Sequence, residues 1–256
     1  MVLRTQIDPS MVVHDEARLA TMRHLPSWAL LAFAAGGVNV GAFLACQVFV
    51  SHVTGTLTRI GADAGNMLGL EYLLVLFCFM TGAGGAVVMV RKLGREGRAL
   101  PYWMPLTLVA MVLVAVAGLG TAGAFGVFGG SVEAAPDFAL LCVLSFAMGM
   151  QNAAVASSTG MAVRTTHMTG PATDLAVAMA TLLVGKSEER GRAKKSVVLR
   201  ATKLAAFVAG AVAMVPLCGR VGFLAFLVPA AACATATISS FAPRLIAEAV
   251  THRART

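Results

Sequence analysis

Residues 51–59 read SHVTGTLTR, and residues 166–174, which lie 115 positions later, read THMTGPATD. A histidine, a threonine and a glycine recur in place, and in the two copies they are His52, Thr54 and Gly55, and His167, Thr169 and Gly170. A segment that recurs at a fixed spacing indicates a chain built from two related halves.

Each copy follows an apolar segment that contains glycine and an amide side chain. Residues 36–39 read GGVN and residues 149–152 read GMQN. We therefore single out Asn39, Gln151 and Asn152 as candidate hydrogen-bonding partners for a polar solute. The alternative is that these amides bond neighbouring helices to one another.

The composition around these segments excludes a soluble fold. Hydrophobic residues make up 58% of the 256 residues and charged residues 12%, whereas soluble domains have about 45–50% and about 25%. The apolar residues form blocks whose lengths mostly suit a helix that crosses a bilayer: 28–47, 71–90, 104–125, 138–156, 204–217 and 221–242. We predict an all-α polytopic bundle of about six spans, in which Lys203 lets the short fifth block reach the interface by snorkelling.

The positive charge is distributed as in a membrane protein. Seventeen of the twenty Lys and Arg fall in residues 1–26, 91–100, 186–203 and 243–256. Basic segments beside apolar spans face the cytoplasm, which predicts a bacterial inner-membrane protein with both termini inside and no nucleic-acid partner. The connections at 126–137 and 218–220 would then face outward.

The number of crossings limits what the repeated segments can be. The chain must cross twice between residue 26 and residue 91, and the two long blocks already do so, so residues 48–70 cannot cross completely. In the second half, both ends of residues 157–185 should lie on the cytoplasmic side, so this segment cannot cross completely either. We therefore predict two re-entrant or broken helices and three complete spans per half. An odd number of spans inverts the second half relative to the first, as in many secondary transporters, with repeats at 27–128 and 129–242 between cytoplasmic ends at 1–26 and 243–256.

The Thr-Gly pairs are typical of helix starts. Thr54 and Thr169 are suitable N-caps, and the unpaired N–H groups of a helix start attract an anion or a carbonyl group. They could equally be satisfied by neighbouring carbonyls or water. The histidines before them could relay protons, or could be packing residues.

Two charged residues, Arg59 and Asp174, occupy equivalent positions after the histidines. Charged groups at bilayer depth usually face a partner or a cavity, so we predict a pair between them that couples the two halves. Local pairs of Arg59 with Asp63 and of Arg164 with Asp174 are alternatives, as is a hydrated Arg59 at the outer interface.

These residues suggest transport more than catalysis. We expect no enzyme, metal or cofactor site, because no nucleophile–base set or metal-ligand spacing is present. The favoured function is transport of a small polar or anionic solute. A passive channel and a non-transporting assembly or signalling partner remain alternatives, and partners beyond the lipid bilayer and the solute, including a second copy of the chain, are left open.

The motifs GGVN at 36–39, FVSHVTG at 49–55, MGMQNA at 148–153 and VRTTHMTG at 163–170 resemble those of the YoaK-like family of bacterial inner-membrane proteins. The resemblance extends from about residue 27 to residue 242. It implies a membrane protein of unknown function and supplies no substrate. The sequence departs from the family pattern at Asn39, where an aspartate is common, and at Thr56, where an asparagine is common.

Overall fold

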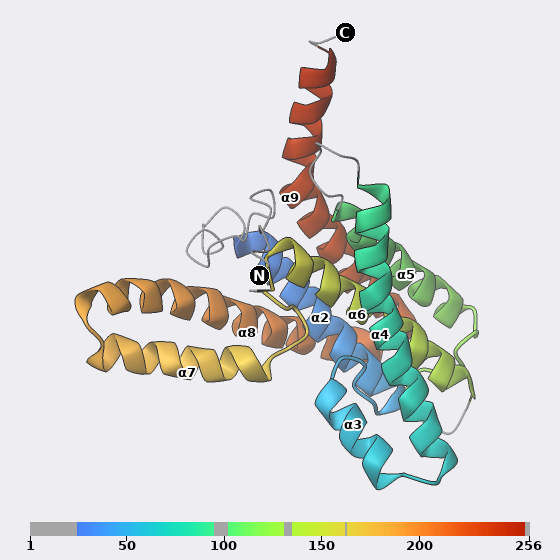
Figure 1. Ribbon diagram of the computed structural model, residues 1–256. Coiled ribbons are helices and arrows are strands. Elements are labelled where there is room, and N and C mark those ends of the chain that lie inside the picture. Colours follow the sequence, from blue (N-terminus) through green and yellow to red (C-terminus); the bar gives the residue numbers. More distant parts are fainter. Residues whose placement is uncertain (1–24, 95–101, 131–134, 162, 254–256) are drawn as a thin grey trace, which may run out of the picture.

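The computed structural model describes residues 25–94, 102–130, 135–161 and 163–253, and within these ranges its regular structure is entirely helical (Figure 1). The elements are α2 (Leu25–Cys46), α3 (Val53–Ala62), α4 (Met67–Leu93), α5 (Trp103–Thr121), α6 (Ala135–Ser158), α7 (Thr169–Val184), α8 (Ser187–Val221), the 3₁₀ helix η1 (Gly222–Phe226) and α9 (Leu227–Arg253). Most of the predicted N-terminal segment 1–26 and of the loop 91–100 lies outside the described residues.

Five stretches are long and apolar enough to cross a membrane, and they indicate a membrane protein. They are Leu25–Cys46, Met67–Leu93, Trp103–Thr121, Pro136–Ser158 and Ser187–Ser240. The last of them contains both blocks that the sequence separates at 204–217 and 221–242. Helix α7 is apolar but shorter, in agreement with a segment that does not cross completely.

The second half differs from the prediction in where its helices begin and end. The basic segment 186–203 is helical from Ser187 and forms the first half of α8. Glu189 supports the start of this helix, because its carboxylate oxygen accepts the Lys186 N–H at 2.9 Å. The turn predicted at 218–220 is also displaced. Helix α8 continues to Val221, and the chain turns at Gly222, whose φ of 54° favours glycine.

Two helix crossings form the centre of the molecule, and each uses the pattern Phe-x-x-Gly on both helices. Helix α2 packs against α8, and α4 packs against α6. A Cβ at each glycine would collide with the carbonyl oxygen of the facing phenylalanine, so the backbones approach as closely as glycine allows. The facing pairs are Gly36 with Phe207 and Gly210 with Phe33 in the first crossing, and Gly82 with Phe146 and Gly149 with Phe79 in the second.

Helices α5 and α9 complete the core. They pack against each other, α5 also against α6 and α9 also against α2. Phe226 of η1 and Leu113 of α5 are fully buried in the apolar cluster between them. These contacts fix α2 and α6, from which the candidate site is built.

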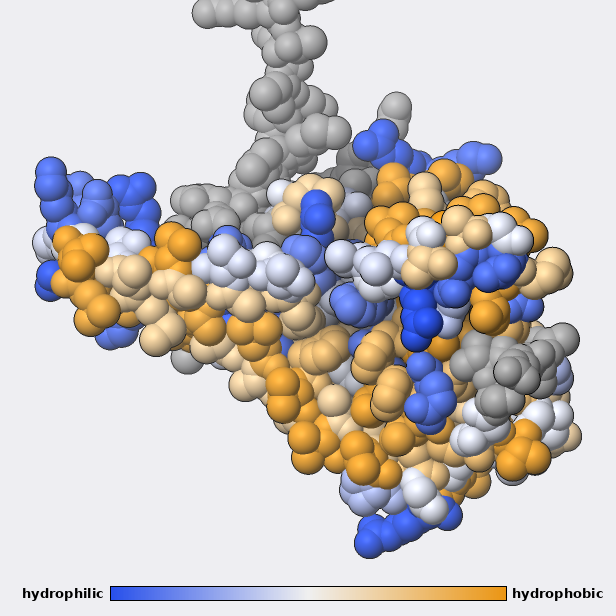
Figure 2. Space-filling model, turned by 90° about the horizontal axis from the view of Figure 1, so that it is seen from below, coloured by the Kyte–Doolittle hydropathy of each residue, from blue (hydrophilic) through white to orange (hydrophobic). Residues whose placement is uncertain are grey.

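Helices α7 and α8 form a hairpin that projects from the body (Figure 1). At its tip, Arg190 donates hydrogen bonds to the carbonyl oxygens of Gly185, at 2.8 Å, and Leu183, at 3.2 Å. Apolar side chains of α7 are exposed, among them Val177, Met179, Leu183 and Val184, and Figure 2 shows apolar surface along one edge of the projecting hairpin with polar surface at its end. This surface suits contact with lipid along the hairpin and water at its tip.

Candidate functional site

The first Thr-Gly segment is held inside the bundle by α2 and α6. Both the backbone N–H and the hydroxyl of Ser51 donate to the Asn39 side-chain oxygen at 3.1 Å. The Ser145 hydroxyl on α6 donates to the Val50 carbonyl oxygen at 3.0 Å. Asn39 lies seven residues before the end of α2, so the connection folds back by about 10 Å along that helix.

The second Thr-Gly segment is held by the matching amides of α6. The Asn152 side-chain oxygen accepts the Thr166 N–H at 3.4 Å. Gln151 is fully buried, and its Nε2 donates to the Thr165 hydroxyl at 3.1 Å and to the Leu31 carbonyl of α2 at 2.9 Å. Asn39 and Asn152 therefore hold the two connecting turns, a role that the sequence did not predict. Gln151 does bond a neighbouring helix, which is the alternative that the sequence left open.

The two turns approach each other from opposite ends of α6. Ser145 binds the first and Gln151 the second, and these residues are six apart, or about 9 Å along the helix axis. Val38, Leu144 and Met148 are fully buried in the apolar core of the same helices. Of these three, Met148 lies between Ser145 and Gln151 on α6.

The helix starts themselves differ from the prediction. Thr54 and Thr169 do not cap them: Thr54 is the second residue of α3 and Thr169 the first of α7. In the second turn the His167 Nε2 accepts the Gly170 N–H at 3.1 Å, whereas His52, at the N-cap of α3, forms no such bond. A Cβ at Gly55 or Gly170 would lie 2.6 Å from a ring nitrogen of its histidine, so the histidine ring can occupy this position only while the residue is glycine.

His167 lies in a basic environment that includes Lys203, for which the sequence predicts snorkelling to the interface. Lys203 does not snorkel to an interface; it is 6% exposed, and its ammonium group donates to the His167 carbonyl oxygen at 2.8 Å. Burial, together with the positive charges of Lys203 and Arg164, lowers the pKa of His167 below its usual 6.5. The neutral imidazole is the form that can accept the Gly170 N–H.

The predicted pair of Arg59 and Asp174 is not formed. Asp174 instead bonds Arg200 of α8, with 3.1 Å between Oδ2 and Nε, because α7 and α8 are adjacent in the hairpin. The local pairs Arg59–Asp63 and Arg164–Asp174 are likewise absent from the part of the chain that the structure describes.

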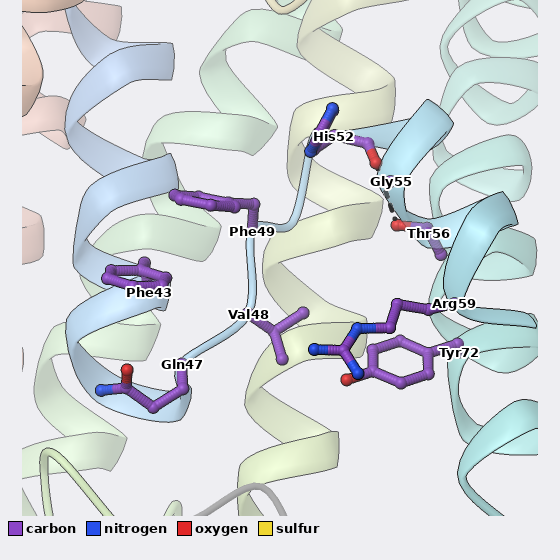
Figure 3. A pocket seen from close by; sticks show the side chains of 9 residues that line it. All are labelled: Phe43, Gln47, Val48, Phe49, His52, Gly55, Thr56, Arg59 and Tyr72. Atoms are coloured by element: carbon purple, nitrogen blue, oxygen red, sulfur yellow. Dashed lines mark hydrogen bonds between the residues drawn. The ribbon is translucent and has the colours of Figure 1, made fainter. Parts of the chain in front are cut away.

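Arg59 lies instead at the wall of a cavity beside the first turn (Figure 3). The cavity has a volume of about 240 Å³. Figure 3 shows the rings of Phe43 and Phe49 on one side and the Arg59 guanidinium beside the Tyr72 ring on the other. The side chains that line it are those of Phe43, Gln47, Val48, Phe49, His52, Thr56, Arg59 and Tyr72, together with Gly55.

The comparisons with known proteins give a family without an assigned activity. A family model described as "Protein of unknown function (DUF1275)" matches residues 28–239. The chain belongs to the DUF1275 family. The match covers both turns of this DUF1275 protein and confirms the resemblance to YoaK-like proteins. No curated protein and no solved structure matches the chain.

The described residues of this DUF1275 protein contain no group of three or more His, Cys, Asp or Glu side chains placed to hold a metal ion. Around the two turns the protein places hydrogen-bonding groups, positive charge and aromatic side chains. Such groups can bind and orient a solute.

Proposed function

We propose that this DUF1275 protein is a transporter for a small polar or anionic solute, with its site at the two His-x-Thr-Gly turns. The observation that carries the proposal is that both turns are drawn into the bundle, from opposite ends of α6, by matching amides. Thr54 and Gly55 lie in the first turn of α3, where N–H groups without a partner in the helix favour negative charge. At the start of α7, beside Thr169, the Gly170 N–H is bonded by His167.

The proposal includes an inverted repeat of two three-span halves. Four Phe-x-x-Gly contacts support it, since the crossing of α2 with α8 matches that of α6 with α4 when the halves are exchanged. The break at Gly222 supports counting α8 and α9 as separate crossings, which gives six. Basic residues near the cytoplasmic ends of α4 and α8 support placing both termini in the cytoplasm of a bacterial inner membrane.

Buried apolar side chains beside the turns favour a transporter over the passive channel. Met148, which lies between Ser145 and Gln151 on α6, is fully buried, as are Val38 and Leu144, and we expect a solute bound at one turn to reach the other only after the halves rearrange. Alternating access in inverted-repeat transporters works by such rearrangement. A non-transporting assembly partner would need no cavity at either turn, and the cavity at His52 argues against it.

The test is solute uptake by the purified full-length protein in proteoliposomes, screened over small polar and anionic solutes. We expect uptake of at least one solute, with loss in His52→Ala and His167→Ala and retention in Arg220→Gln, because Arg220 does not line the cavity. Accumulation above the external concentration, driven by an ion gradient, would distinguish the transporter from the channel. Uptake that is unchanged in both histidine variants would contradict the proposed site.

A further inference from the structure

The cavity beside the first turn has one aromatic wall and one positively charged wall. This difference indicates which class of solute it can bind. On one wall Phe43 and Phe49 are stacked, with ring centroids 4.6 Å apart and planes 10° apart. Phe49 remains 40% exposed, so its ring is open to a further flat group. Aromatic faces in this arrangement favour planar apolar ligands.

The opposite wall carries fixed positive charge. The Arg59 guanidinium lies there beside the Tyr72 ring (Figure 3), and arginine stays charged and presents a planar fork of donors that matches a carboxylate. Tyr72 is 7% exposed and adds a phenol at the same wall. Because no acidic side chain lines the cavity, this charge is not neutralised at the lining.

The aromatic wall also includes His52 of the first turn. Unlike His167 of the second turn, His52 does not cap a helix start with its ring. His52 meets Phe49 edge to face at 6.3 Å between centroids and forms no side-chain hydrogen bond at the helix start. His167 uses its ring nitrogen to cap Gly170. An imidazole without that capping bond is available to a ligand in the cavity.

The dimensions restrict the ligand to a small molecule. The volume of about 240 Å³ is slightly below the range of about 300–1,000 Å³ that is usual for ligand pockets, so it suits a small molecule. Inorganic phosphate would use the charged wall and leave the aromatic wall unoccupied.

We propose that this cavity binds a small organic monocarboxylate with a flat apolar body, its carboxylate on Arg59 and its body against Phe43 and Phe49. The inference rests on the proposed function, because it specifies the solute class at one of the two turns. It assigns recognition of the negative charge to Arg59 and recognition of the apolar body to Phe49.

Equilibrium binding of radiolabelled benzoate to the purified full-length protein tests this assignment, with unlabelled benzamide, acetate and inorganic phosphate as competitors. We expect benzoate to bind saturably. Acetate and phosphate should displace the radiolabelled benzoate at least about tenfold less well than unlabelled benzoate does. Benzamide, which lacks the negative charge, should also displace it poorly. Competition by any of the three as strong as that by benzoate itself, or no saturable benzoate binding, would overturn the proposal.

Variants separate the two walls. Arg59→Gln should weaken benzoate binding at least about tenfold, a change of about 1.4 kcal/mol, and Arg59→Lys should restore part of it. Phe49→Ala should lower the affinity for benzoate but leave the weak affinity for acetate unchanged. Arg220→Gln should bind benzoate as the wild type does. Equal affinity in wild type, Arg59→Gln and Phe49→Ala, all monodisperse on gel filtration, would refute the assignment.

The benzoate-binding experiment and the uptake experiment can fail independently of each other. Benzoate binding that depends on Arg59, in a protein that takes up no solute, would uphold the cavity assignment and remove the transport proposal. Uptake of another solute without benzoate binding would do the reverse.

Discussion

At the scale of single residues, the two asparagines explain how an unusual connection is kept inside an apolar bundle. Backbone N–H groups away from water need a partner, and Asn39 and Asn152 supply one at Ser51 and Thr166. The sequence identified both asparagines as important because of their place before the repeat. Their role depends on a chain segment folding back along the helix, which side-chain type alone does not reveal.

Asn39 gives the first prediction. Asn39→Leu should destabilise the protein by about 1–3 kcal/mol, because the Ser51 N–H and hydroxyl lose their acceptor. Asn39→Asp keeps an oxygen at that position and should stay close to wild type. Thermal unfolding of the two variants in detergent measures the difference, and equal losses of stability would contradict the role given to the side-chain oxygen.

His167 gives a prediction about pH. Its pKa in the folded protein lies below the usual 6.5, so the unfolded state binds more protons as the pH falls through that value. The contribution of His167 to stability is therefore complete above about pH 6.5 and decreases below it. Protonation also removes the acceptor for the Gly170 N–H.

The measurement is the melting temperature of wild type and His167→Gln between pH 7.5 and pH 5, a range of about one unit or more on each side of 6.5. The wild type should lose more stability than the variant on acidification. His52→Gln, which alters the equivalent residue without a capping bond, serves as the control and should follow the wild type. A pH dependence that is the same in all three proteins would exclude His167 as its source.

At the scale of helices, the four glycine contacts explain why α2 and α8, and α4 and α6, pack so closely. Gly82 and Gly84 on α4 form a matched pair, because a Cβ at Gly82 would collide with the Phe146 carbonyl while one at Gly84 meets nothing within 4 Å. Gly82→Ala should cost about 1–3 kcal/mol or more by overpacking. Gly84→Ala should be neutral or stabilising by up to about 1 kcal/mol.

Thermal or denaturant unfolding of Gly82→Ala and Gly84→Ala compares the two sites directly. The Gly36→Ala and Gly149→Ala variants should resemble Gly82→Ala, since their contacts are equivalent. Similar stability for Gly82→Ala and Gly84→Ala would show that the close crossing is not needed.

Hydropathy was sufficient to find the spans but not the ends of every helix. Apolar blocks are long enough to be recognised whatever surrounds them, and α2, α4, α5 and α6 follow the predicted blocks. The segment from 187 to 203 is rich in charged residues and compatible with either a loop or a solvated helix, so hydropathy does not reveal that it forms the first half of α8. Likewise, Asp174 lies near Arg200 only because α7 and α8 form a hairpin, which no local pattern specifies.

At the scale of the whole molecule, the protein combines five apolar stretches, two matching crossings and two turns that approach from opposite ends. The family model shows that the chain belongs to the DUF1275 family, the regular structure of the described residues is helical, and the apolar stretches indicate a membrane protein. The inverted repeat and transport are proposals that depend on the direction from which each turn enters the bilayer. A positive charge at both turns, from Arg59 in one and Lys203 in the other, fits an anionic solute that meets similar chemistry from either side.

The side from which each turn enters the bilayer is measured most directly by the accessibility of single cysteines at Glu71 and Glu189. These positions follow the turns after α3 and α7. The cysteines would be introduced into a folded variant in which the five natural cysteines are replaced, and labelled with a membrane-impermeant thiol reagent in intact spheroplasts and in inside-out vesicles. If the two halves are inverted, Glu71→Cys should react only from the outer side and Glu189→Cys only from the cytoplasmic side. Labelling of both positions from the same compartment would contradict the inverted arrangement.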